Sequence, residues 1–150
     1  MTLENKINLD LLAAMKAKDK VALRGIRAIK ATILLVKTDG SGDTIDKERE
    51  IKILQKLIKQ RKDSLEIFEK QNREDLAIVE REEIEVISKY LPKQMTEDEI
   101  RSIILDIISE TGSSGMKDMG RVMGMASKKL SGKADNKMVA GIVKGLLLGG

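Results

Sequence analysis

Apolar residues recur along most of the chain at steps of three and four, the spacing that gathers side chains on one face of an α-helix. Leu3, Ile7 and Leu11 begin the first such run. No stretch alternates apolar and polar residues as a strand would. The pattern predicts about seven helices: residues 3–17, a second from 19 toward the turn-rich segment 38–44, a third from 46, a fourth at 72–91, a fifth from 96 to the glycine at 112, a sixth at 116–130, and a last through 138–146.

Capping side chains support these boundaries. Thr96 begins the tetrapeptide Thr-Glu-Asp-Glu, a capping box in which the threonine hydroxyl accepts from the third helical amide and Glu99 reaches back. Asn72, with Asp75 three residues later, is predicted to cap the fourth helix in a similar way. Two aspartates are further predicted N-caps: Asp19 and Asp46.

Pro92 is the only proline, and it divides the chain. A proline pushes the residue before it out of helical geometry, so the fourth helix is expected to stop there. We therefore predict an all-α fold in which a four-helix N-terminal lobe, residues 1–92, is followed by a three-helix C-terminal lobe, residues 93–150.

Composition limits the chemistry that this chain can perform. Neither cysteine nor histidine occurs, which excludes disulfides, thiol nucleophiles, thiolate and imidazole metal ligands, and histidine acid–base catalysis. Aromatic residues make up only 1%, so Leu, Ile, Val, Ala and Met must fill the core. We find no convincing catalytic, cofactor-binding or metal-binding constellation, and predict a protein without a cofactor that is not an enzyme.

The segment between the second and third helices matches a calcium loop in part. Asp39, Ser41, Asp43 and Glu50 fall at positions 1, 3, 5 and 12 of an EF-hand pattern. Position 6, however, is Thr44 instead of the glycine that the tight bend requires. We therefore interpret this segment as a polar linker that leads into an acidic helix N-terminus.

Two other segments carry residue types used in catalysis or phosphate binding. Ser113, Ser114 and Lys117 could in principle serve acyl transfer without histidine, but serines before a helix are ordinary capping residues. Residues 131–133, Ser-Gly-Lys, lack the earlier glycine and the following Ser or Thr of a phosphate-binding P-loop. Neither segment is predicted to be an active site.

Charge is distributed unevenly along the chain. The net charge is +4, whereas residues 115–150 contain seven Lys and Arg against two Asp, a local charge of +5. Residues 51–62 form a second basic stretch, in which Lys52, Lys56 and Lys59 share one helical face. Such stretches suit a phosphate backbone, although a solvated lysine face is the plain alternative for each.

An RNA partner fits the C-terminal stretch better than other nucleic acids do. Because Phe68 and Tyr90 are the only aromatic residues, we do not expect base stacking on a single strand, and a folded RNA read by shape and backbone is the better candidate. DNA is not expected as a partner. The candidate nucleic-acid-binding residues are Lys117, Arg121, Lys128, Lys129, Lys133 and Lys137.

The apolar runs of the sequence are short. The longest wholly apolar stretches, such as residues 33–36, fall far short of the roughly 20 residues that span a bilayer, and charged residues interrupt the N-terminal segment. We therefore expect a cytoplasmic protein without a membrane partner.

The predicted sixth helix is rich in methionine and contains Gly120 and Gly124, four residues apart. The missing side chains are expected to let another backbone approach closely. The flexible methionines could also line a groove for a protein partner, although core packing is the simpler interpretation. The methionines concerned are Met116, Met119, Met123 and Met125. A protein-interaction adaptor is thus an alternative function.

Six short motifs, spread in order over nearly the whole chain, resemble the YqeY-like family, also described as the GatB/YqeY domain. They are residues 14–20 (AMKAKDK), 59–64 (KQRKDS), 72–76 (NREDL), 90–94 (YLPKQ), 117–124 (KDMGRVMG) and 132–135 (GKAD). The C-terminal part of this family is related to the tail domain of the B subunit of tRNA-dependent amidotransferase, the enzyme that makes Gln-tRNA or Asn-tRNA.

The resemblance implies a four-helix lobe followed by a three-helix lobe, and a binding role. In the amidotransferase the chemistry belongs to other domains and another subunit, whereas the helical tail engages tRNA. The resemblance therefore implies an accessory protein that binds tRNA or a tRNA-handling enzyme without catalysis of its own. It also implies a weaker alternative, carbon–nitrogen ligase activity with glutamine as amido-N-donor.

Overall fold

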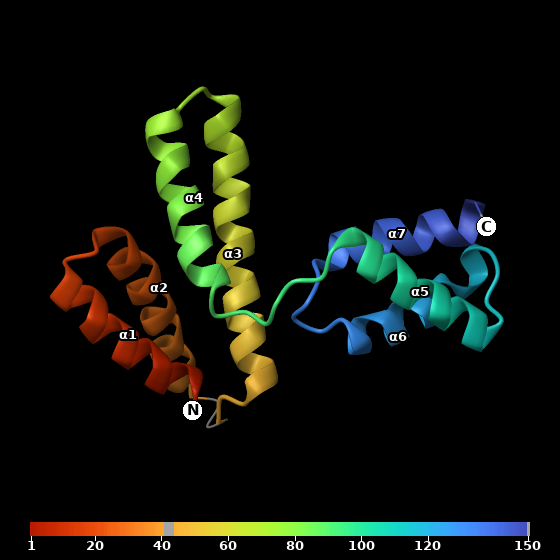
Figure 1. Cartoon of the computed structure of the whole chain (residues 1–150), viewed down its shortest axis with the longest axis horizontal. Helices are drawn as coiled ribbons and strands as arrows, with labels where there is room; N and C mark the ends of the chain where they lie inside the picture. Colours follow the sequence, from red (N-terminus) through yellow and green to blue (C-terminus); the bar gives the residue numbers. More distant parts are fainter. Residues whose placement is uncertain (41–43, 150) are drawn as a thin grey trace. The chain divides into compact units, whose positions relative to one another are not determined.

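The computed structural model describes residues 1–40 and 44–149, and these residues form helices without strands (Figure 1). Of the described residues, 79% are helical. The elements are α1 (Leu3–Ala17), α2 (Lys20–Lys37), α3 (Lys47–Lys70), α4 (Glu74–Ser88), α5 (Glu97–Thr111), the short 3-10 helix η1 (Met116–Asp118), α6 (Met119–Lys129) and α7 (Asn136–Gly149). The all-α class and the seven α-helices predicted from the apolar periodicity are confirmed.

Three of the predicted helix starts have the expected caps. The Asp19 carboxylate accepts from the Ala22 amide at 3.1 Å, and the Thr96 hydroxyl accepts from the Glu99 amide at 3.2 Å. The Glu99 side chain reaches back to the Thr96 amide, which completes the capping box. Asp46 caps α3 in the same way as Asp19 caps α2.

The predicted cap at Asn72 is wrong. Asn72 adopts the left-handed conformation, with φ 57°, and belongs to the end of α3. Its amide donates to the Glu69 carbonyl at 3.1 Å, and the Arg73 amide donates to the Phe68 carbonyl at 2.9 Å. This pair of bonds is a Schellman motif, in which asparagine takes the place that glycine usually occupies. The α4 helix therefore starts at Glu74 without a side-chain cap hydrogen bond.

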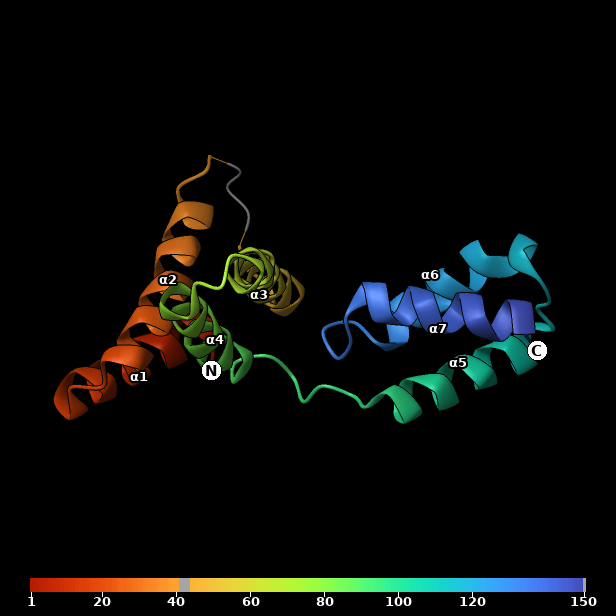
Figure 2. The ribbon, with the colours of Figure 1, turned by 90° about the horizontal axis from the view of Figure 1, so that it is seen from above.

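The chain separates into two compact units, and the first of them ends at Leu91. In this first unit α1 packs against α2, α2 against α4, and α3 against α4 (Figures 1 and 2). One continuous core joins these helices; its fully buried large side chains are Ile7, Ile29, Leu54 and Ile87. Close packing of α2 on α4 requires Gly25, because a Cβ atom there would lie 2.5 Å from Cγ1 of Val86.

The last aromatic residue of the first unit fixes the end of α4 to α1. The Tyr90 hydroxyl donates to the Asp10 carboxylate at 2.5 Å, and the Lys6 ammonium lies 5.3 Å from the centre of the Tyr90 ring. Partial burial and the bond to Asp10 raise the pKa of the Tyr90 phenol above its ordinary value. The phenol therefore remains a hydrogen-bond donor at neutral pH.

The second unit, which starts at Pro92, has a separate core formed by α5, α6 and α7. Its fully buried large side chains are Ile100, Ile104, Ile107, Val122, Val139 and Val143. The predicted sixth helix is divided, because residues 116–118 form a 3-10 turn before α6 begins. The expected close approach at Gly120 and Gly124 is wrong: both are exposed, and a Cβ at either position would meet nothing within 4 Å.

Candidate nucleic-acid interface

The six predicted nucleic-acid-binding cations are all exposed. Lys117 lies in η1, Arg121 and Lys128 lie on α6, and Lys129 is the last residue of that helix. Lys133 follows on the segment between α6 and α7, and Lys137 lies in the first turn of α7. The whole set thus lies on η1, α6, the start of α7 and the segment that joins α6 to α7.

Helical geometry places part of this set on the outer face of α6. Residues of an α-helix follow one another at about 100° per residue, and Val122 and Ala126 mark the side of α6 that packs into the core. Arg121, Gly124 and Lys128 therefore fall on the opposite side. A glycine between two cations leaves this face without an intervening side chain.

The segment between α6 and α7 is held against the residues that precede α5. The Gln94 side-chain amide donates to the Gly132 carbonyl at 2.8 Å, and the Met95 amide donates to the Lys133 carbonyl at 2.8 Å. Gly132 has φ 75°, a backbone conformation that residues other than glycine rarely adopt. Ala134 is buried in the core. Two of the motifs that resemble the YqeY-like family, residues 90–94 and 132–135, therefore contact each other.

Both acidic residues within this basic stretch are engaged locally. The Asp135 carboxylate accepts from the Lys137 amide at 3.0 Å, which caps the start of α7. The Asp118 carboxylate accepts from the Ser114 amide at 2.8 Å and lies 3.8 Å from the Arg121 guanidinium. Spacing of three residues between Asp118 and Arg121 could have indicated that pair, whereas nothing local in the sequence points to Gln94.

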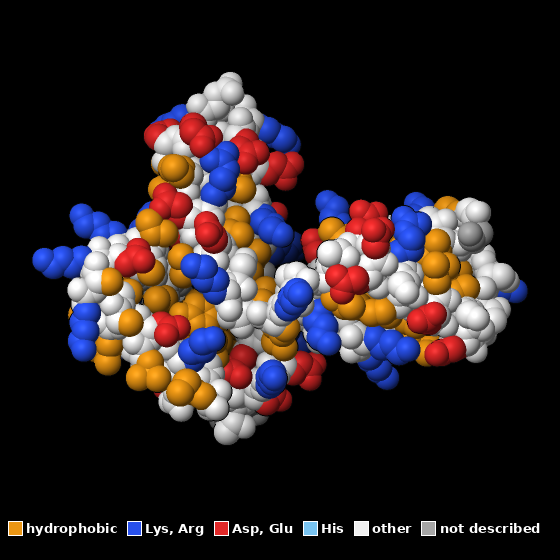
Figure 3. All heavy atoms as spheres, viewed as in Figure 1, with side chains coloured by type: hydrophobic (Ala, Val, Ile, Leu, Met, Phe, Trp, Pro, Cys, Tyr) orange, Lys and Arg blue, Asp and Glu red, His pale blue; other side chains and the backbone are white. Residues whose placement is uncertain are grey.

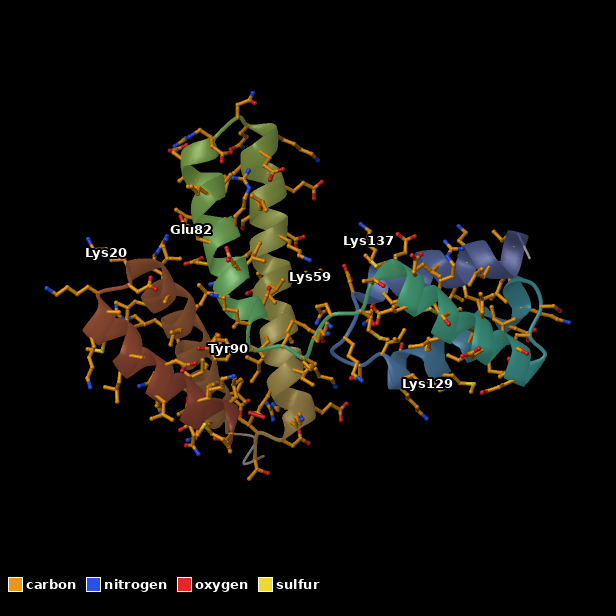
Figure 4. The ribbon with its side chains drawn as sticks, in the orientation of Figure 1. Lys20, Lys59, Glu82, Tyr90, Lys129 and Lys137 are labelled. Carbon is orange, nitrogen blue, oxygen red and sulfur yellow. The ribbon has the colours of Figure 1, made fainter. Side chains whose placement is uncertain are left out.

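The cations do not all face the same way. Figure 4 shows Lys129 at the end of α6 and Lys137 at the start of α7, with side chains that extend away from each other. Among the residues that the structure describes, Arg121 is the only one of the six in an ion pair. The set therefore offers two groups: the outer face of α6 with η1, and the segment that joins α6 to α7.

The basic stretch predicted on α3 is partly neutralised. Lys52 lies 3.6 Å from Glu48, and Arg61 forms a half-buried ion pair with Glu83 at 3.1 Å. The remaining cations are exposed and, within the described part of the chain, make no ion pair: Lys56, Lys59 and Lys62 (Figure 4). Of the five lysines and arginines in residues 51–62, three therefore present unpaired charges.

Two of the four candidate calcium ligands have other partners. The Glu50 carboxylate accepts from the Leu3 amide at 2.7 Å, and Asp39 lies 3.3 Å from the Arg49 guanidinium. The other two, Ser41 and Asp43, lie outside the described residues. Within residues 1–40 and 44–149, no group of three acidic side chains is placed to hold a metal ion.

The serines considered for acyl transfer have structural partners. Ser113 is buried, and its hydroxyl lies 2.6 Å from that of Thr111. Ser114 contributes its amide to the Asp118 carboxylate. Neither serine hydroxyl caps a helix, because η1 and α6 both begin without a side-chain cap hydrogen bond; the predicted capping role is therefore wrong, and both residues belong to the turn that precedes η1.

The methionines of the predicted groove also favour core packing. Met119, Met123 and Met125 pack against the core of the second unit, whereas Met116 is 43% exposed. Three of the four side chains are therefore already used inside the chain. A methionine-lined docking groove finds no support in this arrangement.

Comparison with known sequences gives the family. The family described as Yqey-like protein matches residues 4–147. Relatives named "Altered inheritance of mitochondria protein 41, mitochondrial" include one from Clavispora lusitaniae, 36% identical over 71% of this chain and 62% of its own length. The relative from Lachancea thermotolerans is 37% identical over 70% of this chain and 57% of its own length. That from Pyrenophora tritici-repentis is 32% identical over 86% and 71%.

These relatives correct one prediction. They are named mitochondrial proteins, so the expectation of a cytoplasmic location, which rested on the lack of a recognisable targeting segment, is contradicted. None of the helices in the described residues combines the length and the apolar character needed to cross a lipid bilayer. This chain spans less than two thirds of the length of three of these mitochondrial relatives: 62%, 63% and 57%. With the family match covering nearly every residue, the chain belongs to the Yqey-like protein family.

Proposed function

We propose that this chain is an accessory protein that binds tRNA, free or held by a tRNA-handling enzyme, through its second unit and without catalysis of its own. One observation carries the proposal: five of the six candidate cations are exposed without an ion pair among the described residues, while both acids of the same stretch are engaged locally. The +5 charge of residues 115–150 is therefore presented to solvent.

The chemistry of such a surface favours phosphate. Lysine and arginine that neutralise phosphates release condensed counterions, so affinity depends steeply on salt and little on base sequence. Cations on two differently oriented groups suit a folded RNA, whose backbone curves around a bound protein, better than a flat anionic surface. The likeness of the C-terminal part to the tail of the amidotransferase B subunit points to tRNA among folded RNAs.

The test is charge reversal with a matched control. The variant K129E/K133E/K137E should bind unfractionated tRNA at least about a hundredfold more weakly than the wild type, with a flatter salt dependence, because each lost phosphate contact reduces the log–log slope by about one. The control K56E/K59E/K62E changes the same charge on exposed positions of α3. It should bind nearly as the wild type does in a filter-binding assay.

Three outcomes would contradict this proposal. Equal losses in both triple variants would show that net charge alone matters and that the second unit holds no particular site. Glutamine-dependent amide transfer by the purified chain would contradict the non-catalytic part and support the ligase alternative. Recovery of a protein partner that survives nuclease treatment, with no tRNA binding by the isolated chain, would support the adaptor alternative instead.

A further inference from the structure

The hairpin of α1 and α2 exposes apolar side chains that the first unit leaves uncovered. Leu9, Leu12 and Met15 on α1 are 56%, 57% and 52% exposed. On α2, Leu34 and Leu35 are 50% and 70% exposed. Single exposed leucines are ordinary, but five within one helical hairpin form a surface that calls for a partner.

The same hairpin is as basic as the C-terminal stretch. Residues 1–38 contain eight Lys and Arg against three Asp and Glu, a charge of +5. All three acids are engaged within the first unit: Glu4 with Lys37 at 3.0 Å, Asp10 with the Tyr90 hydroxyl, and Asp19 with the Ala22 amide. Of these three acids only Glu4 pairs with a cation; Asp10 and Asp19 keep their charge but, within the described residues, form no ion pair with a lysine or arginine.

Most of the hairpin's cations are unpaired. Arg24 pairs with Glu82 at 3.3 Å, Lys37 pairs with Glu4, and Lys6 lies over the Tyr90 ring. The others make no ion pair in the described part of the chain: Lys16, Lys18, Lys20, Arg27 and Lys30. Lys16 lies in the last turn of α1, Lys18 lies in the turn between the helices and Lys20 begins α2, where Figure 4 shows the Lys20 side chain extending into solvent.

Apolar and basic side chains share the outer face of each helix. Ile7 and Ala14 mark the buried side of α1, and at about 100° per residue Leu9, Leu12 and Lys16 fall on the opposite side. On α2, Ile29 is buried, and Lys20, Arg27 and Leu34, spaced by seven, fall on the side away from it. Figure 3 shows apolar and basic side chains side by side over the part of the surface formed by α1.

We propose that this basic and apolar surface of the α1–α2 hairpin binds the face of a bilayer that contains anionic phospholipid. Lysines meet the phosphate headgroups, and Leu9, Leu12 and Met15 enter the boundary between headgroups and acyl chains, as on amphipathic helices that lie in the interface. The proposal concerns the surface of a bilayer, so it extends beyond the expectation of no membrane partner, which rested only on the lack of a spanning segment.

The composition of the surface distinguishes this partner from others. Nucleic acid would use the cations and leave five large apolar side chains in water. A protein interface is typically depleted of lysine and anchored by aromatic residues or arginine, whereas four of the five unpaired cations here are lysines, and Tyr90, the aromatic residue that contacts the hairpin, is half-buried against Lys6 and Asp10. A fluid anionic headgroup layer accepts flexible lysines and apolar side chains together.

The experiment measures co-sedimentation of the full chain with phosphatidylcholine vesicles that contain or lack phosphatidylglycerol. The wild type should bind the anionic vesicles, and K16E/K20E should weaken that binding at least about tenfold, given the gain of each lysine near an anionic surface. L9Q/L12Q, which keeps the charge, should weaken it about tenfold through lost apolar burial. Both pairs of side chains are exposed, so circular dichroism and thermal unfolding should match the wild type.

The control variant separates this proposal from tRNA binding. K129E/K133E/K137E should bind anionic vesicles nearly as the wild type does, whereas K16E/K20E should retain tRNA binding. The proposal is overturned if the wild type ignores anionic vesicles, if L9Q/L12Q binds them unchanged, or if the C-terminal triple variant weakens vesicle binding as much as K16E/K20E does. Loss of tRNA binding in K16E/K20E alone would assign the hairpin to nucleic acid.

Discussion

The two ends of the chain carry the same charge in different surroundings. Residues 1–38 and residues 115–150 each have a net charge of +5, and the 13 Lys and Arg and 19 Asp and Glu between them give −6. At both ends the acidic residues are occupied, as caps, as ion-pair partners or as the acceptor of the Tyr90 hydroxyl. Their cations are therefore equally available, and charge alone does not distinguish the two regions.

The uncharged residues beside the cations distinguish the two regions. Around the first region Leu9, Leu12 and Leu35 stand more than half exposed. On α6 the cations instead flank Gly124, above which there is open space. A surface of cations with leucines suits a partner that has an apolar interior, whereas cations that flank an exposed glycine, as Arg121 and Lys128 do, suit a phosphate backbone. Specificity for one anion over another thus comes from the uncharged residues.

The largest effect on stability is expected at the buried glycine of α2. Gly25 is buried against Val86, so G25A should lower the free energy of unfolding of the first unit by about 2–3 kcal/mol through overpacking. Urea unfolding followed by circular dichroism measures it. The double variant G25A/V86A should lose less than the sum of the two single changes, because the contact no longer exists. Additive losses would contradict the packing explanation.

The Tyr90 hydroxyl tests how firmly the end of α4 is held to α1. Y90F removes a hydrogen bond to a carboxylate and should cost about 1.5 kcal/mol in unfolding free energy. Asp10 keeps its negative charge in this variant, so vesicle binding and tRNA binding should both stay constant. Unchanged stability would show that the Tyr90 to Asp10 bond matters little in solution.

The raised pKa of Tyr90 adds a pH dependence with a definite sign. Above about pH 10, the ordinary tyrosine pKa, the unfolded chain loses the phenolic proton while the folded chain still holds it. Ionisation then favours the unfolded state, so the stabilisation by Tyr90 is present below that pH and declines above it. The stability gap between the wild type and Y90F should therefore narrow in alkaline buffer.

The smallest expected effect is a gain in the stability of the second unit. Gly124 is exposed within α6, where glycine costs conformational entropy, and a Cβ added there would meet nothing within 4 Å. G124A should therefore stabilise the second unit by about 0.5–1 kcal/mol. Thermal unfolding measures the change, with G25A as the opposite case. A loss of stability in G124A would mean that the outer face of α6 is covered in the folded protein.

Apolar periodicity and capping residues were sufficient to predict the α-helices and most of their starts. Apolar spacing locates helices because it reports a local property, and the capping box at Thr96 is recognisable within four residues. The error at Asn72 arose because an asparagine suits both a helix start and a left-handed helix end. Only the hydrogen bonds to Glu69 and Phe68 reveal which role it takes.

The candidate site was predictable in composition but not in arrangement. A run of cations is visible in the sequence, yet the bond from Gln94 to Gly132 joins residues 38 apart and leaves no local signal. The charge of +5 over residues 1–38 can be counted in the sequence. The exposed leucines beside it could not be predicted, because only the folded hairpin shows that Leu9 and Leu12 are left uncovered.

The most direct test of tRNA binding through the second unit is a salt titration with the wild-type chain. Six phosphate contacts predict that the logarithm of the association constant falls against the logarithm of salt concentration with a slope of about −5. We expect a slope of this order, flattened in K129E/K133E/K137E. Absence of any salt-sensitive tRNA binding by the wild type would contradict the proposed function.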